Sequence, residues 1–339
     1  FMGRGTTPLE AALLGRVPLA CDINPLSIVL TKPRLHPPTL EQVAERLTQI
    51  NLADHDEFPE DLLVFYHPET LREIAALKKY LLQRQAAGAL DPVDEWIRLI
   101  AINRLTGHSS GFFSVYTLPP NQAVSVKSQT KINRDRNQTP PRRHVREIML
   151  KKTRILLSEC DAFVRRTLAA VSGRARLLTK PAKATPEIKS GSVDLVVTSP
   201  PFLNVVDYAG DNWLRCWFVG IDAKAVAITV PKKLDAWQTA MTAVFRELQR
   251  VLKPRHYHAV VANPPYITPK DPALNEAYRQ RYSTCYRQYS LSVPFLQRIF
   301  SLALDGGFTG QITANSFMKR EFGRKLIEEF LPKIDLTHV

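Results

Sequence analysis

Short apolar runs alternate with amphipathic stretches at both ends of the chain, and a long stretch of helical periodicity lies between them. Near the start, residues 8–14 predict a helix that Gly15 terminates, and residues 17–21 predict a short strand that ends at Asp22. The proline-rich residues 32–39 predict a linker. This order of elements is typical of the beginning of an α/β arrangement.

Residues 40–172 follow a mainly helical pattern, in which Leu71, Ile74 and Leu77 recur at helical spacing. Within this region, residues 117–146 are polar and contain prolines, so we expect a flexible basic loop there. Its arginines and lysines could contact DNA phosphates, although a solvated surface loop has the same composition. The basic side chains of the segment are Lys127, Lys131, Arg134, Arg136, Arg142, Arg143 and Arg146.

From residue 175 onward, short apolar strands alternate again with helices, which predicts a mostly parallel α/β sheet. The predicted strands are residues 176–178, 193–197, 258–262 and 308–313. The predicted helices are residues 235–252, 288–304 and 320–330, with a break at Gly306 and Gly307.

The charge of the chain adds a first functional indication. Its formal net charge is +14 and its sequence pI is about 9.7, which favours a polyanionic partner, although a basic protein without such a partner has the same composition. The four cysteines are scattered without a CxxC pair, so we expect neither a zinc cluster nor a disulfide framework. Without a signal-peptide pattern or an apolar run approaching about 18 residues, we expect a cytoplasmic protein with no membrane association.

A glycine loop enters the first predicted helix. Phe1, Gly3, Gly5 and Thr6 form an FxGxG pattern, and Asp22 follows 17 residues after Gly5, at the end of the next strand. This spacing resembles nucleotide-binding βαβ units, in which an acid after the second strand holds the ribose hydroxyls. The version with FxGxG is similar to proteins that bind S-adenosylmethionine (SAM). Alone, such a loop is equally consistent with an ordinary tight turn.

Ser199, Pro200, Pro201 and Phe202 follow the predicted strand 193–197. Consecutive prolines remove backbone donors and leave carbonyl groups that only accept hydrogen bonds. Together with the serine hydroxyl, they suit the amino group of a base, and the aromatic ring suits stacking of an extruded base. A surface Pro-Pro turn is the alternative.

Asn263, Pro264, Pro265 and Tyr266 repeat this design after the predicted strand 258–262, with an amide oxygen in place of the hydroxyl. Two such tetrapeptides, each after an apolar strand, strengthen the interpretation of both. Of the two, we expect Ser199 to face the cofactor, because it shares a module with Asp22.

These motifs resemble two groups of DNA methyltransferases. Residues 1–254 are similar to site-specific enzymes of the N4-cytosine/N6-adenine class, through FMGRGTT at 1–7, TSPPF at 198–202, DY at 207–208 and WLRCWF at 213–218. Residues 256–339 resemble adenine-specific methyltransferases of BREX-type phage defence, through ANPPY at 262–266, YRQY at 286–289 and QITANSF at 311–317. The resemblance implies a Rossmann-like, SAM-dependent methyltransferase sheet with a mainly helical insertion. It also implies SAM as cofactor, double-stranded DNA as partner, and restriction or phage-defence partner proteins.

The chain departs from the family pattern because it has one glycine loop and two tetrapeptides. We therefore expect a SAM-binding part (1–39), a helical basic insertion for target recognition (40–174), a catalytic part (175–254) and a second partial module (255–339). Both ends look like cuts through a larger fold, so we expect an incomplete or chimeric arrangement.

In the families, serine-type tetrapeptides lean toward cytosine N4 and asparagine-type ones toward adenine N6. An RNA or protein-glutamine methyltransferase and an inactive DNA-binding remnant are the alternatives.

Overall fold

The structure of the protein, a computed structural model, describes residues 1–54, 57–118, 124–198, 208–226, 234–253, 257–262, 268–311 and 316–335. The chain divides into two compact units. Unit 1 comprises residues 1–189 and 200–251, and unit 2 comprises residues 190–199 and 252–339. The mixed α/β class is confirmed, with helices predominating among the described residues.

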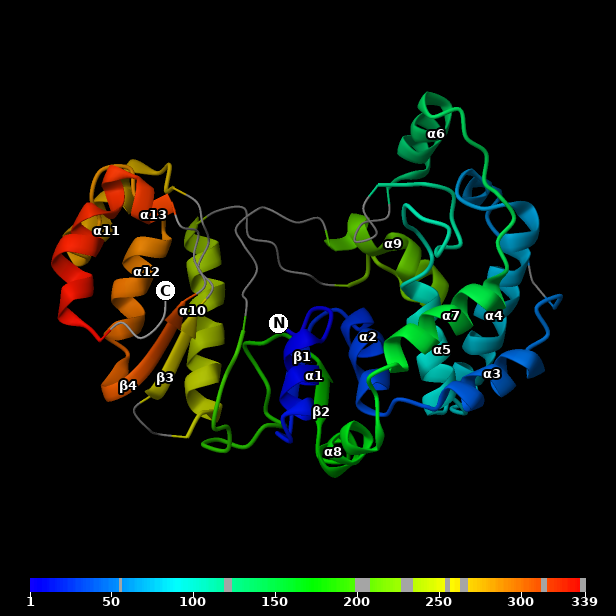
Figure 1. The fold of residues 1–339 in the computed structure, drawn as a ribbon, viewed down its shortest axis with the longest axis horizontal. Coiled ribbons are helices and arrows are strands. Elements are labelled where there is room, and N and C mark those ends of the chain that lie inside the picture. The colour runs from blue at the N-terminus through cyan, green and yellow to red at the C-terminus, as the bar shows by residue number, and fades with distance from the viewer. Residues whose placement is uncertain are drawn as a thin grey trace. The chain divides into compact units, whose positions relative to one another are not determined.

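The regular elements of unit 1 are shown in Figure 1. They are α1 (Thr6–Leu13), β1 (Leu19–Asp22), α2 (Leu26–Leu35), α3 (Leu40–Gln49), a 3-10 helix (Glu60–Val64), α4 (Pro68–Ala86), α5 (Pro92–Ile102), α6 (Val126–Asp135), α7 (Val145–Leu157), α8 (Ala162–Ser172), β2 (Arg176–Thr179), α9 (Tyr208–Val219) and α10 (Leu234–Val251).

The first part of unit 1 is a small parallel sheet with helices packed beside it. β1 pairs with β2 from Leu19 opposite Arg176 to Asp22 opposite Thr179, so both strands end at the same edge. Helices α1, α2 and α8 pack together through a small buried cluster. The cluster consists of Ala12, Leu35, Leu168 and Val171. The predicted helix 8–14 and the predicted strands 17–21 and 176–178 are confirmed, with boundaries shifted by one or two residues.

The main core of unit 1 lies among helices α2, α3, α4, α5, α7 and α9. Leu71, Ile74 and Leu77 are all buried in it, as their helical spacing predicts. Capping residues set the helix starts: Thr39 and Asp91 each form a capping box at α3 and α5. The mainly helical character of residues 40–172 is therefore confirmed.

Unit 2 contains a second pair of parallel strands. Its described elements are β3 (Tyr257–Ala262), α11 (Pro272–Arg281), α12 (Ser292–Phe300), β4 (Ala303–Gln311), α13 (Ser316–Lys319), 3-10 helices at Glu321–Gly323 and Leu331–Lys333, and a π-helix at Leu326–Phe330. β3 pairs with β4, and α12 packs against both strands. Among the described residues of this unit, the buried core is Cys285, Tyr289, Val293, Phe317, Phe322 and Leu326.

Two predictions in the first half of the chain were wrong. The linker predicted at 32–39 begins too early, because α2 continues to Leu35. Its Pro33 lies in the last turn, where it lacks the N–H that would donate to the carbonyl four residues earlier, and the helix ends two residues later. The basic segment is also not a continuous loop: residues 126–135 form α6, which starts at Ser125, whose side chain accepts a hydrogen bond from the Ser128 N–H.

In the second half, the strand predicted at 193–197 is not a regular strand. Val193 makes one bridge to Leu252, while Leu195 and Val197 are 52% and 59% exposed. An apolar run without a neighbouring strand to pair with does not form a ladder.

Gly306 and Gly307 were expected to end a helix, yet β4 runs through both of them. The register of β3 and β4 shifts between Tyr257 and Ala259, opposite the stretch from Ala303 to Phe308, so these glycines lie where the strand bulges. The helix predicted at 288–304 is shorter, Ser292–Phe300, and the one at 320–330 is replaced by a 3-10 turn and a π turn.

No helix among the described residues is both long and apolar enough to span a bilayer.

Candidate cofactor site

The glycine loop lies against the end of β1 in unit 1. The Met2 N–H donates to the Cys21 carbonyl at 3.0 Å, and the Gly3 N–H donates to Asp22 Oδ2 at 2.8 Å. Residues that are 19 positions apart in the sequence are thus joined by a direct hydrogen bond. The structure brings together the loop and the acid that the sequence singled out.

The two glycines of the loop have different surroundings. Both have positive φ, 54° at Gly3 and 83° at Gly5. A Cβ atom added to Gly3 would meet nothing within 4 Å, so the backbone there borders open space. A Cβ atom added to Gly5 would lie 2.1 Å from Oγ1 of Thr31 on α2. Gly5 therefore lets the loop pack onto α2, and Gly3 leaves its own backbone accessible to a ligand.

Asp22 orders the loop and the following turn at the same time. Its Oδ1 accepts a hydrogen bond from the Asn24 N–H at 3.0 Å, while Oδ2 accepts from Gly3. The Asn24 side chain in turn accepts from the Leu26 N–H at 3.0 Å, which starts α2. Each carboxylate oxygen can accept more than one hydrogen bond, so Asp22 keeps acceptor capacity for hydroxyl groups of a ligand.

The other predicted loop residues lie around this arrangement. Phe1 is half-buried at the start of the loop, and Thr6 is exposed at the first position of α1. Burial raises the pKa of the neighbouring Cys21 thiol, which keeps it protonated at neutral pH and unsuited to act as a nucleophile.

Sequence reasoning missed three residues of this edge. Thr31 closes the space behind Gly5, and it is identifiable only once α2 is folded against the loop. Lys180 follows β2, and its N–H donates to the Asp22 carbonyl at 2.9 Å. Asn24 could have been identified from the sequence, because an Asp-x-Asn-Pro run after a strand favours a turn into a helix.

The chemistry of this edge suits the adenosine part of SAM. An accessible backbone at Gly3 permits close approach of a ligand, and the Asp22 carboxylate offers acceptors of the kind that ribose hydroxyls require. Among the described residues, no group of three or more His, Cys, Asp or Glu side chains could hold a metal ion.

Both predicted tetrapeptides, Ser199, Pro200, Pro201 and Phe202 and likewise Asn263, Pro264, Pro265 and Tyr266, lie outside the described residues. The described parts next to them differ. β3 ends at Ala262, directly before Asn263, whereas residues 194–198 before Ser199 have no regular structure.

The predicted DNA-binding residues fall into two groups. Lys127, Lys131 and Arg134 occupy one face of α6, and all three side chains are exposed. The opposite face attaches α6 to unit 1: Gln129 Nε2 donates to the Tyr116 carbonyl at 3.0 Å, and Asn133 Nδ2 donates to the Val64 carbonyl at 2.7 Å. The exposed basic face is therefore presented on a fixed helix.

Arg136 also lies at the surface, with its guanidinium 3.8 Å from the centre of the Tyr116 ring.

The arginines that follow are used in folding. Arg142 forms ion pairs with Glu69 at 2.8 Å and with Glu73 at 2.6 Å, both on α4. The backbone of Arg143 is bonded to Thr70: its N–H donates to Oγ1 at 2.8 Å, and its carbonyl accepts from the same hydroxyl. These contacts fasten the start of α7 to α4, so only part of the basic segment is free to face a partner.

The tyrosine-rich segment of unit 2 has mostly a packing role. Tyr289 is fully buried, and Tyr278 and Tyr282 pack against the same core. Tyr286 differs, because the Arg287 guanidinium lies 5.5 Å and the Lys325 Nζ lies 5.8 Å from its ring centre.

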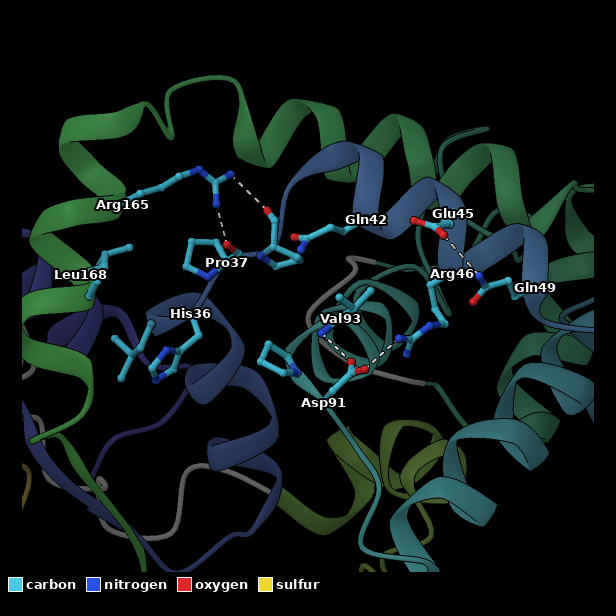
Figure 2. A pocket seen from close by; sticks show the side chains of 14 residues that line it. His36, Pro37, Gln42, Glu45, Arg46, Gln49, Asp91, Val93, Arg165 and Leu168 are labelled. Atoms are coloured by element: carbon cyan, nitrogen blue, oxygen red, sulfur yellow. Dashed lines mark hydrogen bonds and ion pairs between the residues drawn. The ribbon is translucent and has the colours of Figure 1, made fainter.

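A separate pocket of about 600 Å³ lies between the end of α2, α3, the start of α5, and α8 (Figure 2). Arg165 donates to the carbonyls of Pro37 at 2.6 Å and Pro38 at 3.1 Å, and Arg46 pairs with Asp91 at 2.8 Å. The charged groups in its wall thus hold the helices together. None of the described candidate residues lines this pocket, so it is distinct from the predicted cofactor site.

Comparison with known proteins gives one family match. Residues 222–335 match the family described as Eco57I restriction-modification methylase. This range includes α10, β3 and residues 263–266, and it begins after residues 199–202. No solved structure is significantly similar to the chain.

Several curated proteins are similar to parts of the chain. The adenine-specific methyltransferase PglX of Streptomyces coelicolor is 54% identical over 101 residues, which are 27% of this chain and 8% of that protein. The type II methyltransferase M.BsoBI of Geobacillus stearothermophilus is 22% identical over 280 residues, 77% of this chain and 53% of that protein. M.PaeR7I of Pseudomonas aeruginosa is 40% identical over 76 residues, 21% of this chain and 13% of that protein. The chain spans about half of the second relative and much less of the others. The resemblance to DNA methyltransferases is confirmed.

Proposed function

We propose that this chain is the methyltransferase part of a restriction-modification or phage-defence protein, and that it transfers a methyl group from SAM to the exocyclic amino group of adenine (N6) or cytosine (N4) in DNA. The observation that carries the proposal is the hydrogen bond between Gly3 of the FxGxG loop and Asp22. The match of residues 222–335 to a methylase family supports it independently.

In this proposal the loop and Asp22 hold the cofactor. The Asp22 carboxylate accepts hydrogen bonds from the ribose hydroxyls, and the open backbone at Gly3 lets the cofactor lie directly against the loop. Phe1, Gly5 and Thr6 complete the binding loop. When bound, SAM supplies an electrophilic methyl group.

The tetrapeptides hold the base. Ser199 or Asn263 accepts a hydrogen bond from one N–H of the amino group, the carbonyl before the second proline accepts a hydrogen bond from the other N–H, and Phe202 or Tyr266 stacks on the base. Holding both hydrogens directs the nitrogen lone pair, so the rate enhancement comes from orientation. The proton that the nitrogen loses passes to solvent.

The fold assigned to this activity is a Rossmann-like sheet with a helical insertion. The parallel pair β1–β2, with the loop and Asp22 at one edge, supports such a sheet in unit 1. We assign residues 1–39 to cofactor binding, 40–174 to target recognition, 175–254 to catalysis and 255–339 to a second partial module. The parallel pair β3–β4, whose first strand ends directly before Asn263, supports the last assignment.

Double-stranded DNA is the proposed substrate, and α6 is its proposed contact. Lys127, Lys131 and Arg134 share an exposed face, and Arg136 lies at the end of the same helix. Such a row suits the phosphate backbone, which binds without reading sequence.

The test is nucleoside analysis of unmodified DNA after incubation with the purified 339-residue chain and isotopically labelled SAM. We expect labelled N6-methyladenine or N4-methylcytosine. Ser199→Ala and Asn263→Ala, compared side by side, assign the tetrapeptide, because loss of label in one variant alone identifies the base-binding residue. Label in RNA or in protein glutamine instead of DNA would change the substrate class.

Calorimetric titration with SAM separates an inactive remnant from an active enzyme. We expect wild-type protein to bind SAM, and Asp22→Asn to bind it at least about tenfold more weakly, because one carboxylate–hydroxyl interaction is worth about 1.5–3 kcal/mol. Glu10→Gln, which removes the same charge from the exposed surface of α1, is the matched control. Folded wild-type protein that binds no SAM and labels no substrate would refute the enzyme.

A further inference from the structure

A compact loop, residues 104–117, follows α5 in unit 1 and closes on itself. The Phe113 N–H donates to the Arg104 carbonyl at 2.8 Å, and the Thr117 N–H donates to the Gly107 carbonyl at 3.2 Å. The two sides of the loop are thus joined through the backbone, as in the Ω-loops that frequently carry functional groups. Buried apolar side chains fill its interior: Leu105, Phe112, Phe113 and Val115.

The base of this loop is held firmly. A Cβ atom added to Gly107 would lie 2.4 Å from the Phe112 ring, so the ring packs directly on the backbone there. The Arg104 guanidinium lies 4.0 Å from the centre of the same ring. Outside the loop, the Phe65 carbonyl accepts a hydrogen bond from the Val115 N–H at 2.8 Å. The tip of the loop therefore has a defined position on unit 1.

The tip consists of His108, Ser109 and Ser110, and all three residues are exposed. Among the described residues, neither the Ser109 nor the Ser110 hydroxyl has a hydrogen-bond partner. The backbone N–H groups of Ser109, Ser110 and Gly111 likewise donate to no described residue. No acidic residue occurs between positions 95 and 135 of the sequence. A fixed loop thus presents several neighbouring hydrogen-bond donors to the surroundings.

We propose that the tip of this loop, through Ser109, Ser110 and the backbone N–H groups beside them, binds a backbone phosphate of the DNA substrate. Serine hydroxyls and successive backbone N–H groups donate to phosphate oxygens. SAM carries no phosphate, so in the proposed reaction such a site serves the DNA. This inference rests on the proposed function, and it adds an uncharged phosphate contact to the basic face of α6.

Both ends of the loop contact elements assigned to that function. Asn103, directly before the loop, accepts a hydrogen bond at Oδ1 from Nη2 of Arg4 at 3.3 Å, and Arg4 lies between the two glycines of the cofactor loop. At the other end, the Tyr116 carbonyl accepts from Gln129 Nε2 of α6 at 3.0 Å. The five residues from Asn103 to His108 span at most about 18 Å. One DNA strand covers that distance in about five nucleotides, so DNA whose target base reaches the cofactor passes close to the tip.

The experiment measures binding of two fluorescent duplexes of unrelated sequence, and of SAM, to the full chain at several salt concentrations. The variants are Ser109→Ala/Ser110→Ala and Ser109→Thr/Ser110→Thr, which removes or keeps both hydroxyls. Ser158→Ala, at an exposed serine after α7, is the control. We expect the double alanine variant to weaken binding of both duplexes about tenfold. The slope of log K against log salt should stay unchanged, because a neutral donor releases no counterion. The double threonine variant should bind as wild type does, and SAM affinity should change less than about twofold.

Both serines are exposed, and neither hydroxyl makes a hydrogen bond to a described residue, so the substitutions leave the fold intact, which circular dichroism checks. Duplex binding by the double alanine variant that equals that of Ser158→Ala would overturn the proposal, while methylation by wild-type protein leaves the function standing. A loss confined to one of the two duplexes would show that the tip reads bases, and a loss of SAM affinity alone would assign it to the cofactor; either result contradicts a phosphate site. Wild-type protein that neither binds nor methylates DNA would refute the function itself.

Discussion

At the residue scale, the contact between Gly5 and Thr31 determines the shape of the cofactor loop. Gly5 caps α1 with φ of 83°, and the Thr31 side chain occupies the space where a Cβ would lie. The Thr31 hydroxyl is held in place, because it donates to the Ser27 carbonyl at 2.7 Å. A side chain at position 5 would therefore meet both an unfavourable backbone conformation and a fixed neighbour.

Gly5→Ala should lower both stability and SAM affinity. The left-handed conformation costs alanine about 1–2 kcal/mol, and overpacking against Thr31 adds about 1–3 kcal/mol. Gly15→Ala is the control, because Gly15 has φ of 72° but open space around its Cβ position. Chemical denaturation and SAM calorimetry measure both variants. Equal losses in the two would show that the Thr31 contact is unimportant.

At the element scale, α6 is attached through one face and presents another. Gln129 and Asn133 bind backbone carbonyls of the unit, while Lys127, Lys131 and Arg134 remain exposed. Arg142, only a few residues later, forms ion pairs with Glu69 and Glu73. Neighbouring basic residues therefore have different roles, which depend on the contacts of each side chain.

Replacing Lys127, Lys131 and Arg134 together by glutamine should weaken duplex binding and reduce its salt slope by about 3, if each contacts one phosphate. Arg142→Gln should lower stability and leave that slope unchanged. Fluorescence anisotropy at several salt concentrations measures the slopes. A larger slope change in Arg142→Gln than in the triple variant would place the DNA contact elsewhere.

Glu247 and Arg250 of helix α10 both form hydrogen bonds to residues 185–188. Glu247 Oε1 accepts from the Thr185 N–H and hydroxyl, both at 2.7 Å, and pairs with Arg250 at 2.7 Å. The hydrogen bond from Arg250 is the largest cause that lowers the pKa of Glu247, to about 2 from its ordinary 4.5. The carboxylate form is therefore favoured by folding.

The contribution of the Glu247 carboxylate to stability should be complete above pH 4.5. It should be lost as the pH falls toward 2, because the carboxyl group is protonated more readily in the unfolded state than in the folded state. The Glu247 carboxylate contributes at most about 3 kcal/mol to the free energy of unfolding. Urea denaturation at pH 7, 4 and 2.5 should show Glu247→Gln less stable than wild type at pH 7 and close to it at pH 2.5. Glu10→Gln, outside this network, should show no such convergence, and a constant difference for Glu247→Gln would contradict the assignment.

At the scale of the whole molecule, the two units have cores of different size. Among the described residues, the core of unit 1 extends over six helices, whereas the buried cluster of unit 2 contains six residues. All four tryptophans, Trp96, Trp213, Trp217 and Trp237, belong to unit 1. Tryptophan fluorescence therefore reports on unit 1, and circular dichroism reports on both units.

We expect two unfolding transitions, with unit 2 unfolding at the lower urea concentration because its described residues form the smaller buried core. The circular dichroism signal should begin to fall before the fluorescence signal. Val293→Ala should shift only the first transition, and Leu71→Ala, costing about 2–5 kcal/mol, only the second. Coincident transitions by both probes would show a single cooperative unit.

Much of the fold followed from local patterns. Leu71, Ile74 and Leu77 predicted a buried helical face, and the apolar run ending at Asp22 predicted β1. These predictions succeed because periodic burial and short apolar runs are local properties. The run at 193–197 had the same appearance, yet it forms no strand, because a strand also requires a partner that the sequence does not specify.

The sequence by itself determined the candidate chemistry: a glycine loop, an acid one strand later, two proline tetrapeptides and an excess of basic residues. Residue type and spacing carry that information directly. Only the tertiary structure decided that the Gly3 N–H donates a hydrogen bond to Asp22, that Thr31 fills the space next to Gly5, and that Arg142 forms an ion pair with α4. These facts depend on which distant side chains meet after packing, and sequence spacing does not encode those meetings.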